Sequence, residues 1–169
     1  MTHVVIKKVQ GDGSCFYHAV TAASDRPHTN FTKLRNMVAN VYSTVVKGTN
    51  KKLKEQYESL LSYYAGEQNM SPAEYADQTR KCMWAGPLEV EILSKVTKRR
   101  IAVYDMNDLK HNARYKCIYN LADVKPIIDF GDKRRTPIMV VIRGYKPLSN
   151  KFGTHYDALI PVKFVKKQK

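Results

Sequence analysis

An uninterrupted apolar run, Ile138–Ile142, constrains the fold of this 169-residue chain more than any other segment. Successive side chains of a strand point to opposite faces of its sheet, so a strand without a polar face has to be covered on both sides. We therefore expect Ile138–Ile142, within a β-rich run over Pro137–Arg143, to be a central strand that is buried on both faces.

Helical patterns precede this strand. Apolar residues recur at spacings of three and four through Phe31–Val45, which predicts an amphipathic helix capped by Thr32. Ser71, Pro72 and Glu74 have the spacing of a capping box at the start of another helix. We expect further helices over Cys15–Ala23, Leu53–Tyr64 and Leu88–Val96, and further strands over Val4–Val9, Arg100–Asp105, Lys116–Tyr119 and His155–Val162.

This order of elements predicts an α+β fold in which helices pack around a small mixed or antiparallel sheet. No repeat and no linker rich in Pro, Gly or Ser divides the chain, so we expect residues 1–169 to form a single domain. A domain of this length buries about 70% of the surface of its unfolded chain.

Composition restricts the setting in which the chain works. No stretch approaches the ~20 apolar residues that cross a bilayer, and the first residues lack the features of a signal peptide, so we expect a soluble, cytoplasmic protein without membrane contact. Cys15, Cys82 and Cys117 form no CxxC pair and no cluster with metal-ligand spacing. We therefore expect neither a disulfide framework, nor a metal site, nor a cofactor.

The net charge of +14, from 29 Lys and Arg against 15 Asp and Glu, has two interpretations. It favours either a nucleic acid or acidic protein partner, or a generally basic, solvated surface. The pattern lacks the basic stripe and the aromatic–basic signature of nucleic-acid-binding surfaces, so we adopt the second interpretation. Short basic clusters occur at Lys47–Lys54, Lys95–Arg100, Lys133–Arg135 and Lys163–Lys169.

The segment Gln10–Ala19 carries the strongest indication of function. Cys15 follows a turn-forming Gly-Asp-Gly-Ser sequence and precedes an apolar, helix-capable run. At a helix N-terminus, free backbone N–H groups and the helix dipole favour a thiolate, and the same N–H groups can hold an oxyanion. A lone cysteine is most often a small buried side chain, and the segment by itself leaves both interpretations open.

A second segment, His155–Ile160, has the pattern of a strand. Residues i and i+2 of a strand share a face, so the carboxylate of Asp157 can orient and charge-stabilise the imidazole of His155. A thiol nucleophile, a base and an orienting acid are the groups of a cysteine protease, and such groups meet in space rather than in sequence. A histidine at the surface or at the edge of the core is the alternative for His155.

Two further residues have open roles. His18 lies almost one turn after Cys15, where we expect it to be packed or solvated rather than catalytic. Trp84, the only tryptophan, either anchors the core or lies beside a cleft in its Trp-Ala-Gly turn.

These motifs, taken in order, resemble those of the ovarian tumour (OTU) family of cysteine proteases. Asp12–Ala19 resembles its Asp-Gly-x-Cys-x-(Phe/Tyr) motif, and His155–Asp157 matches its closing His-Tyr-(Asp/Asn). Ala85 departs from the family pattern, which usually has glycine at this position. Between the two motifs, Leu34–Arg35 resembles the Leu-Arg that opens the following helix, Trp84–Glu89 resembles the Trp-Gly-x-x-x-Glu segment, and Ile101–Tyr104 looks like the next strand.

The resemblance spans roughly residues 4–162 and implies a papain-like fold that hydrolyses the isopeptide bond at the C-terminus of ubiquitin or of a ubiquitin-like modifier. It implies that Cys15 is the nucleophile, His155 the general base and Asp157 the orienting acid. Backbone amides of the Asp12 loop, together with that of Cys15, would form the oxyanion hole. Trp84 would flank the channel that receives the Gly-Gly tail of the substrate.

The compact chain is similar to the OTU domains that viruses use to strip ubiquitin or interferon-induced modifiers from host proteins. We accordingly expect a monomer that acts on ubiquitin-conjugated proteins, in the host cytoplasm if the protein is viral. One alternative is an OTU-fold module that binds ubiquitin without catalysis, although a complete Cys/His/Asp set argues against it. The other is a nucleic-acid-binding domain that uses the net charge.

Overall fold

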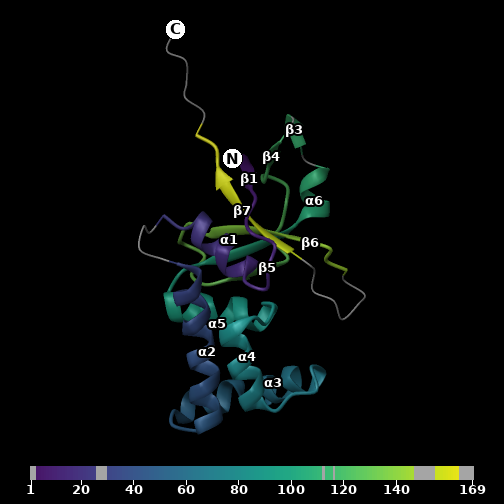
Figure 1. The fold of residues 1–169 in the computed structure, drawn as a ribbon. Coiled ribbons are helices and arrows are strands. Elements are labelled where there is room, and N and C mark those ends of the chain that lie inside the picture. Colours follow the sequence, from purple (N-terminus) through teal and green to yellow (C-terminus); the bar gives the residue numbers. More distant parts are fainter. Residues whose placement is uncertain (1–2, 26–29, 112, 116, 147–154, 164–169) are drawn as a thin grey trace.

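The computed structural model describes residues 3–25, 30–111, 113–115, 117–146 and 155–163, which form helices and one mixed sheet (Figure 1). The α+β class is confirmed. The helices are α1 (Cys15–Ala23), α2 (Phe31–Lys47), α3 (Lys51–Glu67), α4 (Pro72–Lys81), α5 (Pro87–Thr97) and α6 (Met106–Lys110). The strands are β1 (His3–Lys7), β2 (Ile101–Asp105), β3 (Ala113–Tyr115), β4 (Ile118–Asn120), β5 (Ile128–Phe130), β6 (Ile138–Arg143) and β7 (His155–Pro161).

The seven strands of the sheet follow the order β3-β4-β1-β7-β6-β2-β5. β6 lies between β7, to which it is antiparallel, and β2, to which it is parallel. All five residues of Ile138–Ile142 are buried, which confirms the prediction of a strand covered on both faces.

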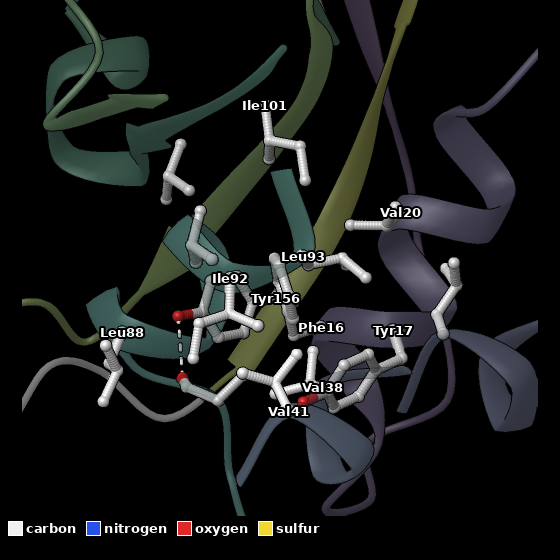
Figure 2. Close-up of a cluster of buried hydrophobic side chains, with 14 of the residues drawn as sticks. Phe16, Tyr17, Val20, Val38, Val41, Leu88, Ile92, Leu93, Ile101 and Tyr156 are labelled. Atoms are coloured by element: carbon white, nitrogen blue, oxygen red, sulfur yellow. Dashed lines mark hydrogen bonds between the residues drawn. The ribbon is translucent and has the colours of Figure 1, made fainter. Parts of the chain in front are cut away.

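Alternate side chains of β6 belong to two separate cores. The larger core lies between the sheet and helices α1, α2 and α5, and it includes Ile138, Val140 and Ile142. The smaller core contains Met139 and Val141 and lies against α6. Figure 2 shows the larger core, where Phe16 of α1 and Tyr156 of β7 have ring centroids 5.1 Å apart among aliphatic side chains of α2 and α5.

A buried carboxylate joins helices α2, α4 and α5. α2 packs on α3, α4 and α5 (Figure 1), and Glu89 of α5 is only 3% exposed among them. Its Oε1 accepts hydrogen bonds from the hydroxyls of Tyr42 (2.8 Å) and Tyr75 (3.0 Å). Its Oε2 accepts the backbone N–H of Gly86 at 2.7 Å, at the N-terminus of α5 where a negative charge is favourable. Burial and the Glu89 charge raise the pKa of both phenols, which therefore remain protonated donors.

The ends of two helices test the predicted caps. The capping box of Ser71 and Glu74 is confirmed. The prediction of Thr32 as the cap of α2 is wrong, because α2 begins at Phe31 and the Asn30 side chain accepts the Lys33 N–H at 2.8 Å. Asparagine is a stronger N-cap than threonine, and Thr32 is already the second residue of the helix.

The strand that was predicted over Lys116–Tyr119 is β4, which begins at Ile118; Lys116 lies outside the described residues. β3, β5 and α6 are elements that the sequence patterns did not indicate. Each is only three to five residues long, too short for a periodic pattern to develop.

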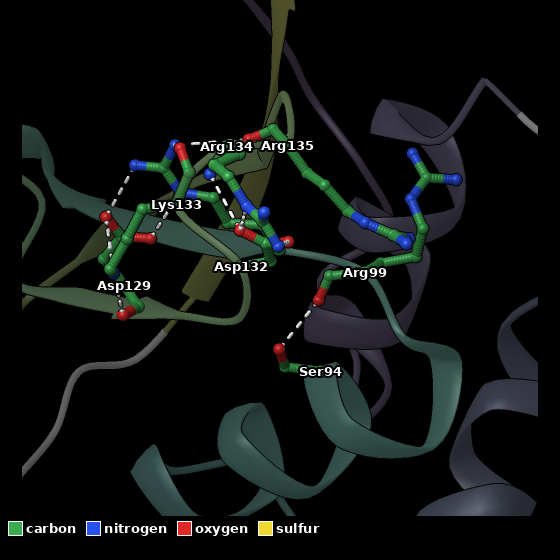
Figure 3. Close-up of polar contacts among 8 residues, drawn as sticks. Ser94, Arg99, Asp129, Asp132, Lys133, Arg134 and Arg135 are labelled. Atoms are coloured by element: carbon green, nitrogen blue, oxygen red, sulfur yellow. Dashed lines mark hydrogen bonds and ion pairs between the residues drawn. The ribbon is translucent and has the colours of Figure 1, made fainter.

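Two basic clusters of the sequence meet at the end of α5 (Figure 3), where they bind carboxylates and carbonyls of the protein itself. Arg135 donates to the carbonyl of Lys98, at the C-terminus of α5, with a distance of 2.9 Å. These contacts show that the basic side chains of both clusters are engaged within the protein itself. The ion pairs are Arg99–Asp25, Arg100–Asp129, Lys133–Asp129 and Arg134–Asp132, each 2.8 to 2.9 Å long.

Two kinds of feature are missing from the part of the chain that the structure describes. It contains no helix with the length and apolar character needed to cross a membrane. It also contains no group of three or more His, Cys, Asp or Glu residues that could hold a metal ion.

We predict that Tyr75→Phe lowers the free energy of unfolding by about 1–3 kcal/mol, because the buried Glu89 carboxylate loses one of its donors. Tyr63→Phe is the matched control, since the Tyr63 side chain on α3 is 60% exposed. Urea unfolding of both variants measures the difference. An equal stability of the two variants would contradict the anchoring role of Glu89.

Candidate active site

A tight turn leads into α1 and presents Cys15 at its first residue. The Ser14 N–H donates to the Asp12 carboxylate at 2.8 Å, and the Cys15 N–H donates to the Asp12 carbonyl at 3.1 Å. Aspartate is a common residue for such a side-chain-supported turn. The chain becomes helical at once, because the His18 N–H donates to the Ser14 carbonyl at 3.0 Å.

The surroundings of Cys15 oppose its ionisation. Burial raises the pKa of the thiol above its ordinary value, and the Asp12 charge adds to this effect. The backbone N–H groups of Tyr156, Phe16 and Cys15 itself lower the pKa but do not outweigh burial. We expected the helix N-terminus to favour the thiolate. The nearby backbone groups do lower the pKa of Cys15, but burial raises it by more, so the net shift is upward. The thiol needs a base to ionise it.

β7 brings a histidine to the same turn. The Cβ of an alanine at Gly11 would lie 3.8 Å from both Nδ1 and Cε1 of His155, so this edge of the imidazole faces the turn. The backbone of Tyr156, the next residue of β7, lies close enough to Cys15 to lower the pKa of its thiol. The packing of α1 against β7 thus brings together Cys15 and His155, which are 140 positions apart in the sequence.

The other edge of the imidazole is held by Asp157. His155 Nε2 lies 2.8 Å from Asp157 Oδ1, which leaves Nδ1 on the side of the turn. Asp157 also accepts the Val9 N–H at 3.0 Å and Arg143 Nε at 3.1 Å. Burial raises the pKa of this carboxyl, but the hydrogen bonds from Val9, His155 and Arg143 prevail and hold the pKa below its usual range. A charged Asp157 orients the ring and can stabilise an imidazolium.

Trp84 stands out from a segment whose backbone is fixed on both sides. The carbonyl of Ala85 accepts the Tyr156 hydroxyl at 2.9 Å, and the N–H of Gly86 is bound by Glu89. Trp84 itself is 53% exposed, so it is not an anchor of the core. Ala85, the departure from the family pattern, is buried, and its own carbonyl makes the first of these two contacts.

Three residues near the turn were not predicted to take part in the site. Arg143 is a second partner of Asp157, and Arg35 is a buried contact of the Cys15 turn. His18 packs on Phe31, with ring centroids 4.0 Å apart, and its Nε2 lies 3.4 Å from Asp12 Oδ2. His18 is therefore packed, as expected. Only the Leu-Arg motif drew attention to Arg35, and no pattern indicated Arg143.

Comparison with known proteins places this chain in a family. Residues 10–128 match the model of the OTU-like cysteine protease family, so the chain belongs to this family. The match contains Cys15 and Trp84 and ends before β7, so the positions of His155 and Asp157 come from the structure alone. No curated protein sequence matched the chain.

Solved structures share the fold at low sequence identity. The Hazara virus OTU bound to ubiquitin superposes with a TM-score of 0.58 and 19% identity, over 96% of this chain and 84% of that one. The viral OTU domain protease from Qalyub virus gives 0.56 and 19%, over 96% and 89%. An OTU deubiquitinase from Wolbachia pipientis wMel gives 0.54 and 16%, over 94% and 88%.

We predict that Asp157→Asn destabilises the protein more at pH 6 than at pH 3. The folded-state pKa of Asp157 is lowered, so its stabilisation is complete above the unfolded-state pKa of about 3.9 and is lost as the pH falls through the folded-state value. Urea unfolding across this range measures the gap between variant and wild type. A gap that stays constant from pH 3 to pH 6 would contradict a charged Asp157.

Proposed function

We propose that this protein is a thiol-dependent deubiquitinase that uses Cys15, His155 and Asp157. The observation that carries the proposal is the orientation of His155: its Nε2 is bound by Asp157 while its Nδ1 edge faces the turn that presents Cys15. Membership of the OTU-like cysteine protease family supports thiol chemistry. The solved OTU domain of Hazara virus, which is bound to ubiquitin, supports ubiquitin as the substrate.

The chemistry follows from the roles of these groups. His155 takes the proton of the Cys15 thiol, and the sulfur attacks the carbonyl carbon of the terminal glycine of ubiquitin to form a C–S bond. The C–N bond to the lysine breaks as His155 returns the proton to the leaving amine. His155 then deprotonates a water molecule, which attacks the thioester and releases the carboxylate and the Cys15 thiol. Because burial raises the pKa of Cys15, the histidine acts here as a base toward a neutral thiol.

The turn before Cys15 is the proposed source of the oxyanion hole. Backbone N–H groups that are aimed at the developing charge stabilise such a transition state. The Cys15 N–H now donates to the Asp12 carbonyl, so Asp12 has to release this hydrogen bond before the N–H can bind an oxyanion. In this proposal, substrate binding opens the turn.

Trp84 is the proposed contact for the extended C-terminal tail of the substrate. A half-exposed indole on a backbone held by buried partners can flank a peptide without moving.

We further propose that residues 1–169 act as one catalytic domain and that the protein works in the cytoplasm. The similarity to OTU domains of viruses supports an action on host ubiquitin, or on a ubiquitin-like modifier, in an infected cell.

We predict a one-to-one covalent adduct when the protein reacts with ubiquitin that carries a C-terminal electrophile. Cys15→Ala and His155→Ala abolish the adduct and the turnover of a ubiquitin substrate, and Asp157→Ala reduces turnover less completely. Intact mass and circular dichroism measure the adduct and the fold. Cys82→Ala is the matched control, since the Cys82 thiol is exposed outside the site. Undiminished turnover by Cys15→Ala would exclude the proposed mechanism, and a wild type that forms no adduct would favour a different modifier or a binding module.

We also predict that Trp84→Ala raises KM for a ubiquitin substrate about tenfold, the cost of losing an interface anchor worth about 1.4 kcal/mol. The kcat should change little, because Trp84 does not touch the reacting atoms in this proposal. Tyr63→Ala removes another exposed aromatic side chain, on the distant helix α3, and should leave both constants unchanged. Equal kinetics for the two variants would remove Trp84 from the substrate channel.

A further inference from the structure

A buried cation lies directly behind the turn that presents Cys15. Arg35 of α2 is 2% exposed, and its guanidinium stacks on the Tyr17 ring with 4.6 Å between Cζ and the ring centroid. Within the described part of the chain no carboxylate forms an ion pair with Arg35, and its Nε has no hydrogen-bond partner. The charge is satisfied by carbonyls and one hydroxyl.

The guanidinium links two segments that are far apart in the sequence. Nη2 donates to the Gly13 carbonyl and to the Ser14 hydroxyl, which lies 3.0 Å away. Nη1 donates to carbonyls at the end of α4, Thr79 at 2.7 Å and Met83 at 3.0 Å. One planar fork therefore fastens the Cys15 turn to the segment that precedes Trp84.

The turn and the end of α4 are also in direct backbone contact. A Cβ at Gly13 would lie 2.3 Å from the Cys82 carbonyl oxygen, so only glycine permits this approach. Arg35 fixes the direction of the Gly13 carbonyl at this contact. Because the C=O and N–H of a trans peptide point in opposite directions, this also aims the Ser14 N–H at the Asp12 carboxylate, 2.8 Å away.

A buried, unpaired guanidinium contributes little to the stability of a fold. A buried charge loses its hydration at a cost of several kcal/mol, and replacement by an apolar side chain of similar volume is often neutral or stabilising. Arg35 also leaves one buried N–H unpaired. Its donors meet the one turn whose geometry determines where the Cys15 sulfur lies.

We propose that Arg35 is a positioning residue for the reaction of Cys15. It acts through the Gly13 carbonyl and the Ser14 hydroxyl, and it holds the turn in register with the end of α4. The role rests on the proposed function, since it assumes that Cys15 is the nucleophile. Arg35 itself touches neither sulfur nor substrate.

The test is Arg35→Lys, which keeps the charge but replaces the rigid fork with a single nitrogen. A lysine cannot reach acceptors on both segments in the geometry of a guanidinium, so the turn shifts. A displacement of the order of 1 Å lowers catalysis by up to ~100-fold, and we expect kcat to fall about 10- to 100-fold. KM stays within about threefold of wild type, because the Trp84 segment keeps its anchors to Tyr156 and Glu89.

Arg80→Lys is the matched control. Arg80 also joins α4 to α2, through Asn40 Oδ1 at 2.9 Å and Asn36 Oδ1 at 3.5 Å, but it makes no contact with the turn. Its kcat and KM should equal those of the wild type. If Arg35 only stabilised the fold, Arg35→Lys would reduce the fraction of active molecules and leave each active molecule as fast as before. We therefore divide the rate by the concentration of active sites, which is titrated with the ubiquitin electrophile.

A second measurement does not require ubiquitin. In a Cys82→Ser, Cys117→Ser background, Cys15 is the one cysteine that iodoacetamide can alkylate. Because the thiolate is the reactive form, the pH midpoint of the alkylation rate measures how readily Cys15 ionises. We expect Arg35→Lys to raise this midpoint, because the displaced turn loses backbone N–H groups that stabilise the thiolate, whereas Arg80→Lys leaves it unchanged. This readout stands even if ubiquitin proves not to be the substrate.

Two results would overturn the proposal. The first is a kcat per active site in Arg35→Lys equal to that of Arg80→Lys, with any loss of activity confined to the fraction of active molecules. The second is an unchanged alkylation midpoint. If Arg35→Lys does not fold, Ser14→Ala removes only one acceptor of the fork. It should then lower kcat by a smaller factor and raise the midpoint in the same direction, and wild-type values for Ser14→Ala would overturn the proposal.

Discussion

The antiparallel pairing of β1 with β7 is the interaction on which the site depends. Residues 4–7 pair with 161–158, so the chain leaves β1 beside the strand that carries the histidine. The Val9 N–H then donates to Asp157, two residues before the turn begins. β1 and β7 lie next to each other at the middle of the sheet. The Cys15 thiol and the His155 imidazole, 140 positions apart in the sequence, therefore meet at the same turn.

Three buried ionic side chains then fix the segments around this turn. Asp157 holds the histidine, Arg35 holds the turn, and Glu89 holds the start of α5. Each binds several groups that come from different elements, so removal of any one of them leaves unpaired polar groups in the interior. The site is thus built on three sets of buried hydrogen bonds, which restrict its geometry more tightly than packing alone does.

Local patterns predicted what depends on local geometry. The capping box at Ser71, the doubly buried strand and the adjacency of His155 and Asp157 all follow from the periodicities of helices and strands. The contacts of Arg35 could not be predicted, because a guanidinium that binds main-chain carbonyls 22 to 48 residues away has no sequence pattern. The raised pKa of Cys15 was missed for a related reason: burial is set by the complete fold, whereas the favourable amides are set by the neighbouring residues.

The segment around Trp84 is held by its main chain: the carbonyls of Met83 and Ala85 and the N–H of Gly86 all bind buried groups. Main-chain anchors do not depend on which side chain a residue carries. The exposed side chain at position 84 can therefore be exchanged without disturbing the scaffold that presents it. If position 84 contacts the substrate as proposed, single substitutions there change what the protein recognises while the buried contacts behind it stay the same.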